Sequence, residues 1–536
     1  MFTSKSKKQA AKLKDEGNAL FTQKLYAEAY AKYSEAIAKD STNATYFANR
    51  AACSLNMRKS LDAGHDALQA TLLDPSYAKA HARLATAEFM IGSFISSVKS
   101  WQSAIAALPS RNLTPAELKQ KAEWTRDISV AADRMDEVIL RGSPPVPHPT
   151  QAPWLRAMAM EDELKERGDE GLLGSVWVIL PAFRLWSTGI RALKDFYETG
   201  SVEEVDPTIL ENLTDSLIWD SRIFYEDQDT FSEIYNPYMK ALFMKFKFTS
   251  TGGTEHITSQ ILQRQEQDGW DATRTSLNLT IRTRILRAFV TGKSQRHYIG
   301  EEISLRCVLD VLEWGNTGPW KDVPLKTKGD IFARKFVRGI RSLHMISYRQ
   351  ASGEDPQNYP MENLYEEAKA ALQECESAEE KSADLSSDRG FVNAFYNYPK
   401  GFALGTIGYY HSDVARKAAL NSEPTKYHSN QAAQAFRDAA ECFPQDDELH
   451  VYWLSNAIHS MWHCPAQDLV PIMEKLRLAE LEKKKIWEHS LTMNAIPDYA
   501  TQLETIISTE KKILEGILLG KFKLEDPLIP EDSLPQ

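Results

Sequence analysis

The feature that most constrains this chain is a repeat of 34 residues near its N-terminus. Small residues recur at this step in three registers, which are Ala29, Ala63 and Ser97; Ala36, Ala70 and Ala104; and Gly17, Ala51 and Ala85. A fourth register, formed by Ser41, Pro75 and Pro109, marks the end of a helix in each unit. Because small residues let helices approach closely, this period predicts antiparallel helix pairs stacked as a solenoid.

Five polar residues within the repeat form a candidate binding site. Lys14 and Asn18 are four residues apart, as are Lys79 and Arg83, so each pair shares one face of a helix. Asn49 lies roughly midway between the two pairs. Any one of them alone would be an ordinary solvated side chain. Three cations and two amides on successive helices, in contrast, could converge on one small anionic ligand.

The repeat resembles the tetratricopeptide-repeat (TPR) family, with three units at about 10–43, 44–77 and 78–111. The five polar residues resemble the two-carboxylate clamp of co-chaperone TPR domains, in the strings 14–18 (KDEGN), 49–51 (NRA) and 79–83 (KAHAR). In that family the clamp holds the C-terminal Glu-Glu-Val-Asp of cytosolic 70- and 90-kDa heat-shock chaperones. The resemblance implies that one carboxylate is bound by Lys14, Asn18 and Asn49, and the other by Lys79 and Arg83.

Composition is consistent with an acidic peptide ligand. The 536 residues leave room for several domains and carry a net charge of −11, which argues against a dedicated nucleic-acid binder. Residues 1–109 carry +5, which leaves −16 for the remainder. A basic N-terminal segment would speed the encounter with an acidic peptide at low salt.

We expect a cytoplasmic protein without a membrane anchor. The five cysteines are far apart and show no disulfide pattern, which favours a reducing compartment. The N-terminus lacks the apolar core of a signal peptide. The most apolar run, residues 172–183, is too short to span a bilayer and contains Pro181.

The whole chain is expected to be all-α. Three TPR repeats at 8–111 are followed by a capping helix at 112–141, whose start is marked by Thr114 and Pro115. A proline-rich linker at 142–153 precedes a helical body at 154–523 and a disordered tail at 524–536. Residues 431–490 are predicted to be TPR-like, because the spacing of Ala29, Tyr33, Ala36 and Ser41 recurs in Ala432, Phe436, Ala439 and Pro444.

Other motifs are weaker. His459, His463 and the adjacent Cys464 could approach one zinc ion, but residue 460 is serine where a metalloprotease needs glutamate, and we expect no metal or cofactor. The internal string 203–206 (EEVD) has no terminal carboxylate and should not fill the clamp. Two basic runs could meet phosphate, but in an acidic body we expect them to pair with carboxylates: Arg282, Arg284, Arg287, Lys293, Arg296 and His297; and Arg334, Lys335, Arg338 and Arg341.

These patterns predict a non-enzymatic co-chaperone or adaptor. The clamp would bind the chaperone tail, while the body contacts a client or a second protein partner. Two alternatives stay open. One is a scaffold whose TPR surface binds other acidic C-terminal peptides, and the other is an enzyme with an unrecognised site within 154–523.

Overall fold

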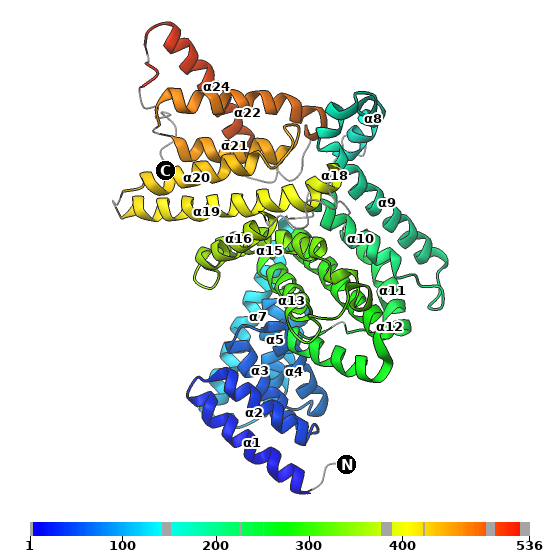
Figure 1. The fold of residues 1–536 in the computed structure, drawn as a ribbon. Coiled ribbons are helices and arrows are strands. Elements are labelled where there is room, and N and C mark those ends of the chain that lie inside the picture. Colours follow the sequence, from blue (N-terminus) through cyan, green and yellow to red (C-terminus); the bar gives the residue numbers. More distant parts are fainter. Residues whose placement is uncertain are drawn as a thin grey trace. The chain divides into compact units, whose positions relative to one another are not determined.

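The chain folds into helices, and the predicted all-α class is confirmed (Figure 1). The computed structural model describes residues 4–141, 152–224, 228–249, 251–294, 296–376, 389–421, 424–462, 464–488, 499–521 and 523–525, and contains no β-strand within them. Two compact units result. Unit 1 comprises residues 1–143, 201–205 and 236–333, and unit 2 comprises residues 144–200, 206–235 and 334–536.

Unit 1 begins with three helix pairs and one longer helix, coloured blue to cyan in Figure 1. These are α1 (Ser4–Thr22), α2 (Tyr26–Lys39), α3 (Ala44–Asn56), α4 (Ser60–Leu73), α5 (Ala78–Met90), α6 (Phe94–Ala106) and α7 (Pro115–Arg141). The small residues of the repeat lie at the helix contacts. Ala29, Ala63 and Ala104 have no exposed surface, and an added Cβ on Gly17 would lie 2.8 Å from the Tyr33 ring.

The repeat period extends to the turn inside each pair. Lys24, Arg58 and Gly92, each 34 residues apart, all adopt positive φ, at 62°, 60° and 77°. This left-handed conformation ends the first helix of a repeat and directs the chain into the second. The turns between repeats are also alike, because the carboxylates of Asp40 and Asp74 each accept from the backbone N–H two residues later, at 3.1 and 3.0 Å.

The capping helix begins as its sequence predicts. The Thr114 N–H donates to the Glu117 carboxylate at 2.8 Å, and the Glu117 N–H donates to the Thr114 hydroxyl at 3.3 Å. This reciprocal pair is a capping box. Helix α7 then covers the end of the solenoid, with Trp124 and Ala131 packed in one cluster with Trp101.

Unit 1 is completed by a later segment of the chain. It contains the C-terminal part of α11 (Gln228–Phe246), then α12 (Thr254–Phe289), a π-helical turn η4 (Val290–Ser294), α13 (Tyr298–Thr317), α14 (Leu325–Lys328) and a short 3₁₀ turn η5 (Asp330–Phe332). Gly269, at φ 79°, interrupts the helical geometry of α12. The boundary between the units falls inside α11.

Helix α12 is joined to the second TPR repeat at its N-terminus. Its N-cap residue, Gly253, has no side chain that could bind the first N–H groups. Asp62 of α4 supplies the missing acceptor, because its carboxylate accepts from the N–H groups of Gly253 and His256 at 3.0 and 3.3 Å. The rings of His65 and His256 stack beside it with centroids 3.5 Å apart. The TPR helices therefore form part of a larger fold in unit 1.

Unit 2 is also helical. Its elements are α8 (Pro153–Glu166), η2 (Gly168–Leu173), α9 (Val176–Thr199), α10 (Thr208–Trp219), η3 (Ser221–Ile223), α15 (Arg334–Glu354), α16 (Met361–Glu376), α18 (Arg389–Val392), η6 (Asn393–Asn397), α19 (Tyr398–Leu420), α20 (Lys426–Ala440), α21 (Glu448–Met461), α22 (Ala466–Trp487) and α24 (Tyr499–Leu518). Helices α19 and α20 repeat the close approach of the first TPR pair, because a Cβ on Gly408 would lie 2.5 Å from the Phe436 ring.

A buried charged cluster lies in the core of unit 2. The Arg222 guanidinium binds the carboxylates of Asp220 and Asp447, each at 2.7 Å, and lies 4.0 Å from the centroid of the Trp487 ring. These carboxylates hold the pKa of Arg222 well above its usual value, although burial acts in the opposite direction. The Glu448 carboxylate lies 3.3 Å from the same guanidinium, and these contacts join η3 to α21 and α22 within unit 2.

Parts of the predicted domain organisation stay predictions. The linker at 142–153 and the tail at 524–536 lie almost wholly outside the described residues. Of the helices that are described, none is long and apolar enough to cross a membrane.

Candidate functional site

The five predicted site residues all lie on the first helices of the three repeats. Lys14 and Asn18 belong to α1, Asn49 to α3, and Lys79 and Arg83 to α5. Because α1, α3 and α5 are the corresponding helices of successive repeats, the solenoid places these residues in one layer. Lys14, Asn49 and Arg83 are partly buried, whereas Asn18 and Lys79 are exposed.

Hydrogen bonds connect three of the five residues across the three helices. The Asn49 amide donates to the Asn18 side-chain oxygen at 3.2 Å, and the Arg83 guanidinium lies 3.5 Å from the Asn49 side-chain oxygen. The Tyr33 hydroxyl, from α2, also donates to the Asn18 oxygen at 2.8 Å. The Asn18 oxygen is thus occupied by two donors, so its NH₂ group remains for an acceptor outside the protein.

The cations of the site are poorly neutralised. Lys14 has one carboxylate nearby, that of Asp15 at 2.9 Å, whose side chain is 70% exposed. No carboxylate in the described part of the chain lies within ion-pair distance of Lys79 or Arg83. Partial burial lowers the pKa of Arg83, against the opposing effect of Tyr77 and Tyr33. A partly buried guanidinium without a counter-charge favours a bound anion.

Residues beside the predicted five have different roles. Arg50 follows Asn49 in sequence, but its guanidinium makes a two-pronged contact with the Asp66 carboxylate at 2.8 and 2.7 Å. This contact joins α3 to α4, so the Arg50 guanidinium stabilises the packing of the second repeat. The sequence pattern places Tyr33 only in the spacing of the second helix of a repeat. Its hydroxyl proves to orient Asn18, and the repeat pattern contains no signal for that contact.

The histidine pair and the internal EEVD string, which are weaker motifs of the sequence, both make contacts within the chain. The His459 ring lies 2.7 Å from the Ser455 carbonyl, while His463 is outside the described residues. Within the described part of the chain, no three His, Cys, Asp or Glu side chains are grouped so that they could hold a metal ion. In the internal EEVD string, Val205 is buried, and the Lys245 ammonium binds the carbonyl oxygens of Glu203 and Val205 at 2.6 and 3.2 Å.

Comparison with known proteins confirms the resemblance to TPR co-chaperones. The chain is 33% identical over 135 residues to the small glutamine-rich tetratricopeptide repeat-containing protein 2 of Mycosarcoma maydis, which covers 25% of this chain and 38% of that protein. It is 34% identical over 99 residues to the heat-shock protein cognate (HSC) co-chaperone sgt12 of Aspergillus fumigatus, a match that covers 18% of this chain and 29% of that protein.

One similar solved structure is the first TPR of Spaghetti (RPAP3) bound to the HSP90 peptide SRMEEVD. It is 25% identical, covers 24% of this chain and 95% of that one, and has a TM-score of 0.22. No family model matches the chain. The matches to curated relatives span between about a fifth and two fifths of the relatives' own lengths. The likeness is therefore to a segment of these proteins.

Proposed function

We propose that this chain is a non-enzymatic co-chaperone or adaptor of the cytoplasm. Its TPR helices would bind the free C-terminal carboxyl end of a 70- or 90-kDa heat-shock chaperone, and the rest of the chain would contact a client or a second protein partner. The observation that carries the proposal is the hydrogen-bonded line from Asn18 through Asn49 to Arg83. It joins three successive repeats, and neither Lys79 nor Arg83 has a carboxylate within ion-pair distance in the described part of the chain.

The chemistry of the tail complements these donors. The last residue of an EEVD tail offers a main-chain and a side-chain carboxylate. Under the proposal, Lys14, Asn18 and Asn49 bind one of them, and Lys79 and Arg83 bind the other. Charge-assisted hydrogen bonds to both would require a free terminal acid. The relative named as an HSC co-chaperone supports a chaperone as the source of the tail.

Substitution of the two cations on α5 tests the assignment. Lys79→Ala and Arg83→Ala in the full chain should each weaken the binding of a peptide ending in Met-Glu-Glu-Val-Asp by about 1.5–3 kcal/mol, the range for hydrogen bonds to charged groups. Lys99→Ala, at an exposed lysine of α6, is the matched control and should leave the affinity unchanged. Calorimetric titration measures all three.

If both α5 variants bind the peptide like the wild type, the assignment of the two carboxylates is wrong. Tight binding of acidic C-terminal peptides that lack the chaperone motif would instead favour a scaffold with broader specificity.

A further inference from the structure

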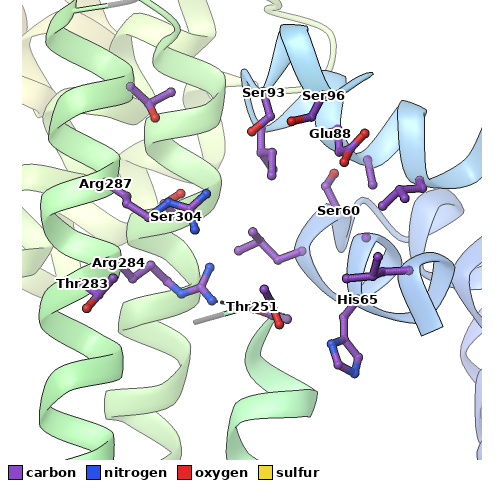
Figure 2. A pocket seen from close by; sticks show the side chains of 18 of the residues that line it. Ser60, His65, Glu88, Ser93, Ser96, Thr251, Thr283, Arg284, Arg287 and Ser304 are labelled. Atoms are coloured by element: carbon purple, nitrogen blue, oxygen red, sulfur yellow. Dashed lines mark hydrogen bonds between the residues drawn. The ribbon is translucent and has the colours of Figure 1, made fainter. Parts of the chain in front are cut away.

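Unit 1 contains a second candidate site, which shares none of its residues with the candidate peptide site. A cavity of about 250 Å³ lies between α4–α6 and the helices α12 and α13. Its TPR wall includes Ser60, Glu88 and Ser93, and its opposite wall includes Arg284, Arg287 and Ser304 (Figure 2). The cavity is smaller than the pockets of drug-sized ligands, so it suits a small molecule.

Arg284 is the unusual residue of this cavity. Its side chain extends from α12 toward the TPR helices, although the residue is only 7% exposed. One terminal nitrogen donates to the Gly252 carbonyl at 2.6 Å, and Nε is buried without a partner. No carboxylate in the described part of the chain forms an ion pair with this guanidinium.

Two carboxylates of the TPR helices, one in the wall of the cavity and one beside it, are already engaged. Asp62 accepts from the backbone of Gly253 and His256, and Glu88 accepts from the Ser100 hydroxyl at 2.7 Å. The sequence predicts that the basic runs pair with carboxylates. This is correct for Arg341, which binds Glu374, and wrong for Arg284.

A buried guanidinium without a counter-charge is costly, because the desolvation of the charge is not compensated. The neighbouring Thr283 adds a buried hydroxyl that has no hydrogen-bond partner. Arg287 brings a second cation to the same wall, one turn of helix further on. Two cations and several hydroxyls therefore line the α12 side of the cavity and favour an anion there, while the Glu88 carboxylate on the TPR wall is bound to Ser100.

We propose that this cavity binds the phosphate group of a small phosphomonoester. The planar guanidinium of an arginine matches two phosphate oxygens. A second guanidinium and the surrounding hydroxyls can bind the third oxygen of a phosphomonoester, whereas a carboxylate has only two oxygens. The limited volume leaves room for a small organic part. The site is separate from the candidate peptide site, and the two proposals stand independently.

A phosphate held here would contact the TPR helices and α12 together. Because a ligand that binds only the folded state stabilises it, phosphate should raise the melting temperature of the protein. The test uses the full chain in chloride buffer, with inorganic phosphate and then free O-phosphoserine as probes at matched ionic strength. We expect saturable binding of both in calorimetry and a melting temperature that rises with their concentration.

Three variants locate the binding. Arg284→Gln should lower the affinity for both probes at least about tenfold, and so should Arg287→Gln, because each substitution removes hydrogen bonds to a charged group. Arg287 is exposed, so its substitution should not disturb folding. If Arg284→Gln fails to fold, the Arg287→Gln variant alone tests whether phosphate binds in this cavity. Arg274→Gln is the control, because Arg274 lies on the same helix outside the cavity and pairs with Asp271 at 2.7 Å.

The outcomes separate the possible sources of the phosphate. Tighter binding of free O-phosphoserine than of a short peptide containing phosphoserine supports a small-molecule ligand, and the reverse order overturns that part of the proposal. The absence of phosphate binding by the wild type overturns it entirely. So does equal binding by the wild type and the folded Arg287→Gln variant.

Discussion

The Tyr33 hydroxyl reaches Asn18 from the second helix of the first repeat and fixes the orientation of that amide. An amide that must present NH₂ to a ligand needs its oxygen occupied, and Tyr33 and Asn49 together provide this. At the scale of single residues, the candidate site therefore depends on a side chain outside the five residues proposed to bind the peptide.

Removing this hydroxyl is a direct check. Tyr33→Phe should weaken the binding of the chaperone tail peptide by about 0.5–1.5 kcal/mol, the net value of one hydrogen bond. The melting temperature should barely change, because the exposed Asn18 can accept from water instead. Calorimetric titration and a thermal melt measure the two effects. Tyr30→Phe on the same helix is the control, and an equal loss of affinity in that variant would refute the orienting role of Tyr33.

How far the site could be predicted also differs from residue to residue. Lys14, Asn18, Asn49, Lys79 and Arg83 could be chosen because the period places them on successive helices and because their pattern resembles the carboxylate clamp of co-chaperone TPR domains. Tyr33 could not be chosen, because the repeat spacing gives only its place on a second helix and only the folded structure brings its hydroxyl to Asn18. Arg284 looked like one more arginine in a basic run until its surroundings were known.

At the scale of helices, the repeat depends on close approach at a few glycines. Gly17 and Gly64 both lie inside helices, but their surroundings differ. A Cβ on Gly17 would lie 2.8 Å from the Tyr33 ring, whereas a Cβ on Gly64 would meet the Ala87 Cβ at an ordinary 3.5 Å. The same chemical change should therefore have opposite effects at the two positions.

Gly64→Ala should stabilise the protein by up to about 1 kcal/mol, since alanine is the better helix former. Gly17→Ala should destabilise it by about 1–3 kcal/mol, the usual cost of overpacking. It should also weaken peptide binding by displacing Tyr33. Denaturant unfolding of the two variants checks the sign of each change. Stabilisation by Gly17→Ala would show that α1 and α2 are not as closely packed as described.

The helices were easier to predict than their ends. The cap at Thr114 follows from local residues, because Thr114 and Glu117 are neighbours in sequence. The cap of α12 does not, because its acceptor is Asp62, 191 residues earlier. The positive φ of Lys24 and Arg58 was equally hidden, since neither residue type favours that conformation. Only Gly92 carries a local signal.

At the scale of the whole molecule, buried titratable groups couple the stability of unit 1 to pH. Glu301 of α13 is 5% exposed, and burial raises its pKa from 4.5 to about 7, with Lys293 opposing. The folded state therefore holds a proton that the unfolded chain releases. The stability linked to this proton is fully present below pH 4.5 and is lost as the pH rises through 7.

Glu301→Gln should remove this dependence. Between pH 4.5 and 7 the stability of the wild type relative to the variant should fall by up to about 1.4 kcal/mol per pH unit. Comparison with the variant is needed because His256, whose pKa burial lowers to about 3, contributes a dependence of opposite sign. Denaturant unfolding across this range measures the difference. Parallel pH profiles would show that Glu301 is not buried as described.

The organisation of the whole chain was only partly predictable. The period predicts a TPR solenoid, and the residue pattern of 154–523, which has few alternating strand runs, predicts helices in the body. That residues 236–333 join the TPR helices in one compact unit depends on contacts between distant segments, which no local pattern encodes. The cavity beside Arg284 was hidden for the same reason.

The central claim is that the TPR helices of this chain recognise a free terminal carboxylate. Calorimetric titration of the full chain with a peptide ending in Met-Glu-Glu-Val-Asp, alongside its C-terminally amidated twin, tests it most directly. We predict binding of the free acid with an affinity on the order of micromolar and loss of binding for the amide. Equal binding of the two peptides, or binding of neither, would contradict the claim.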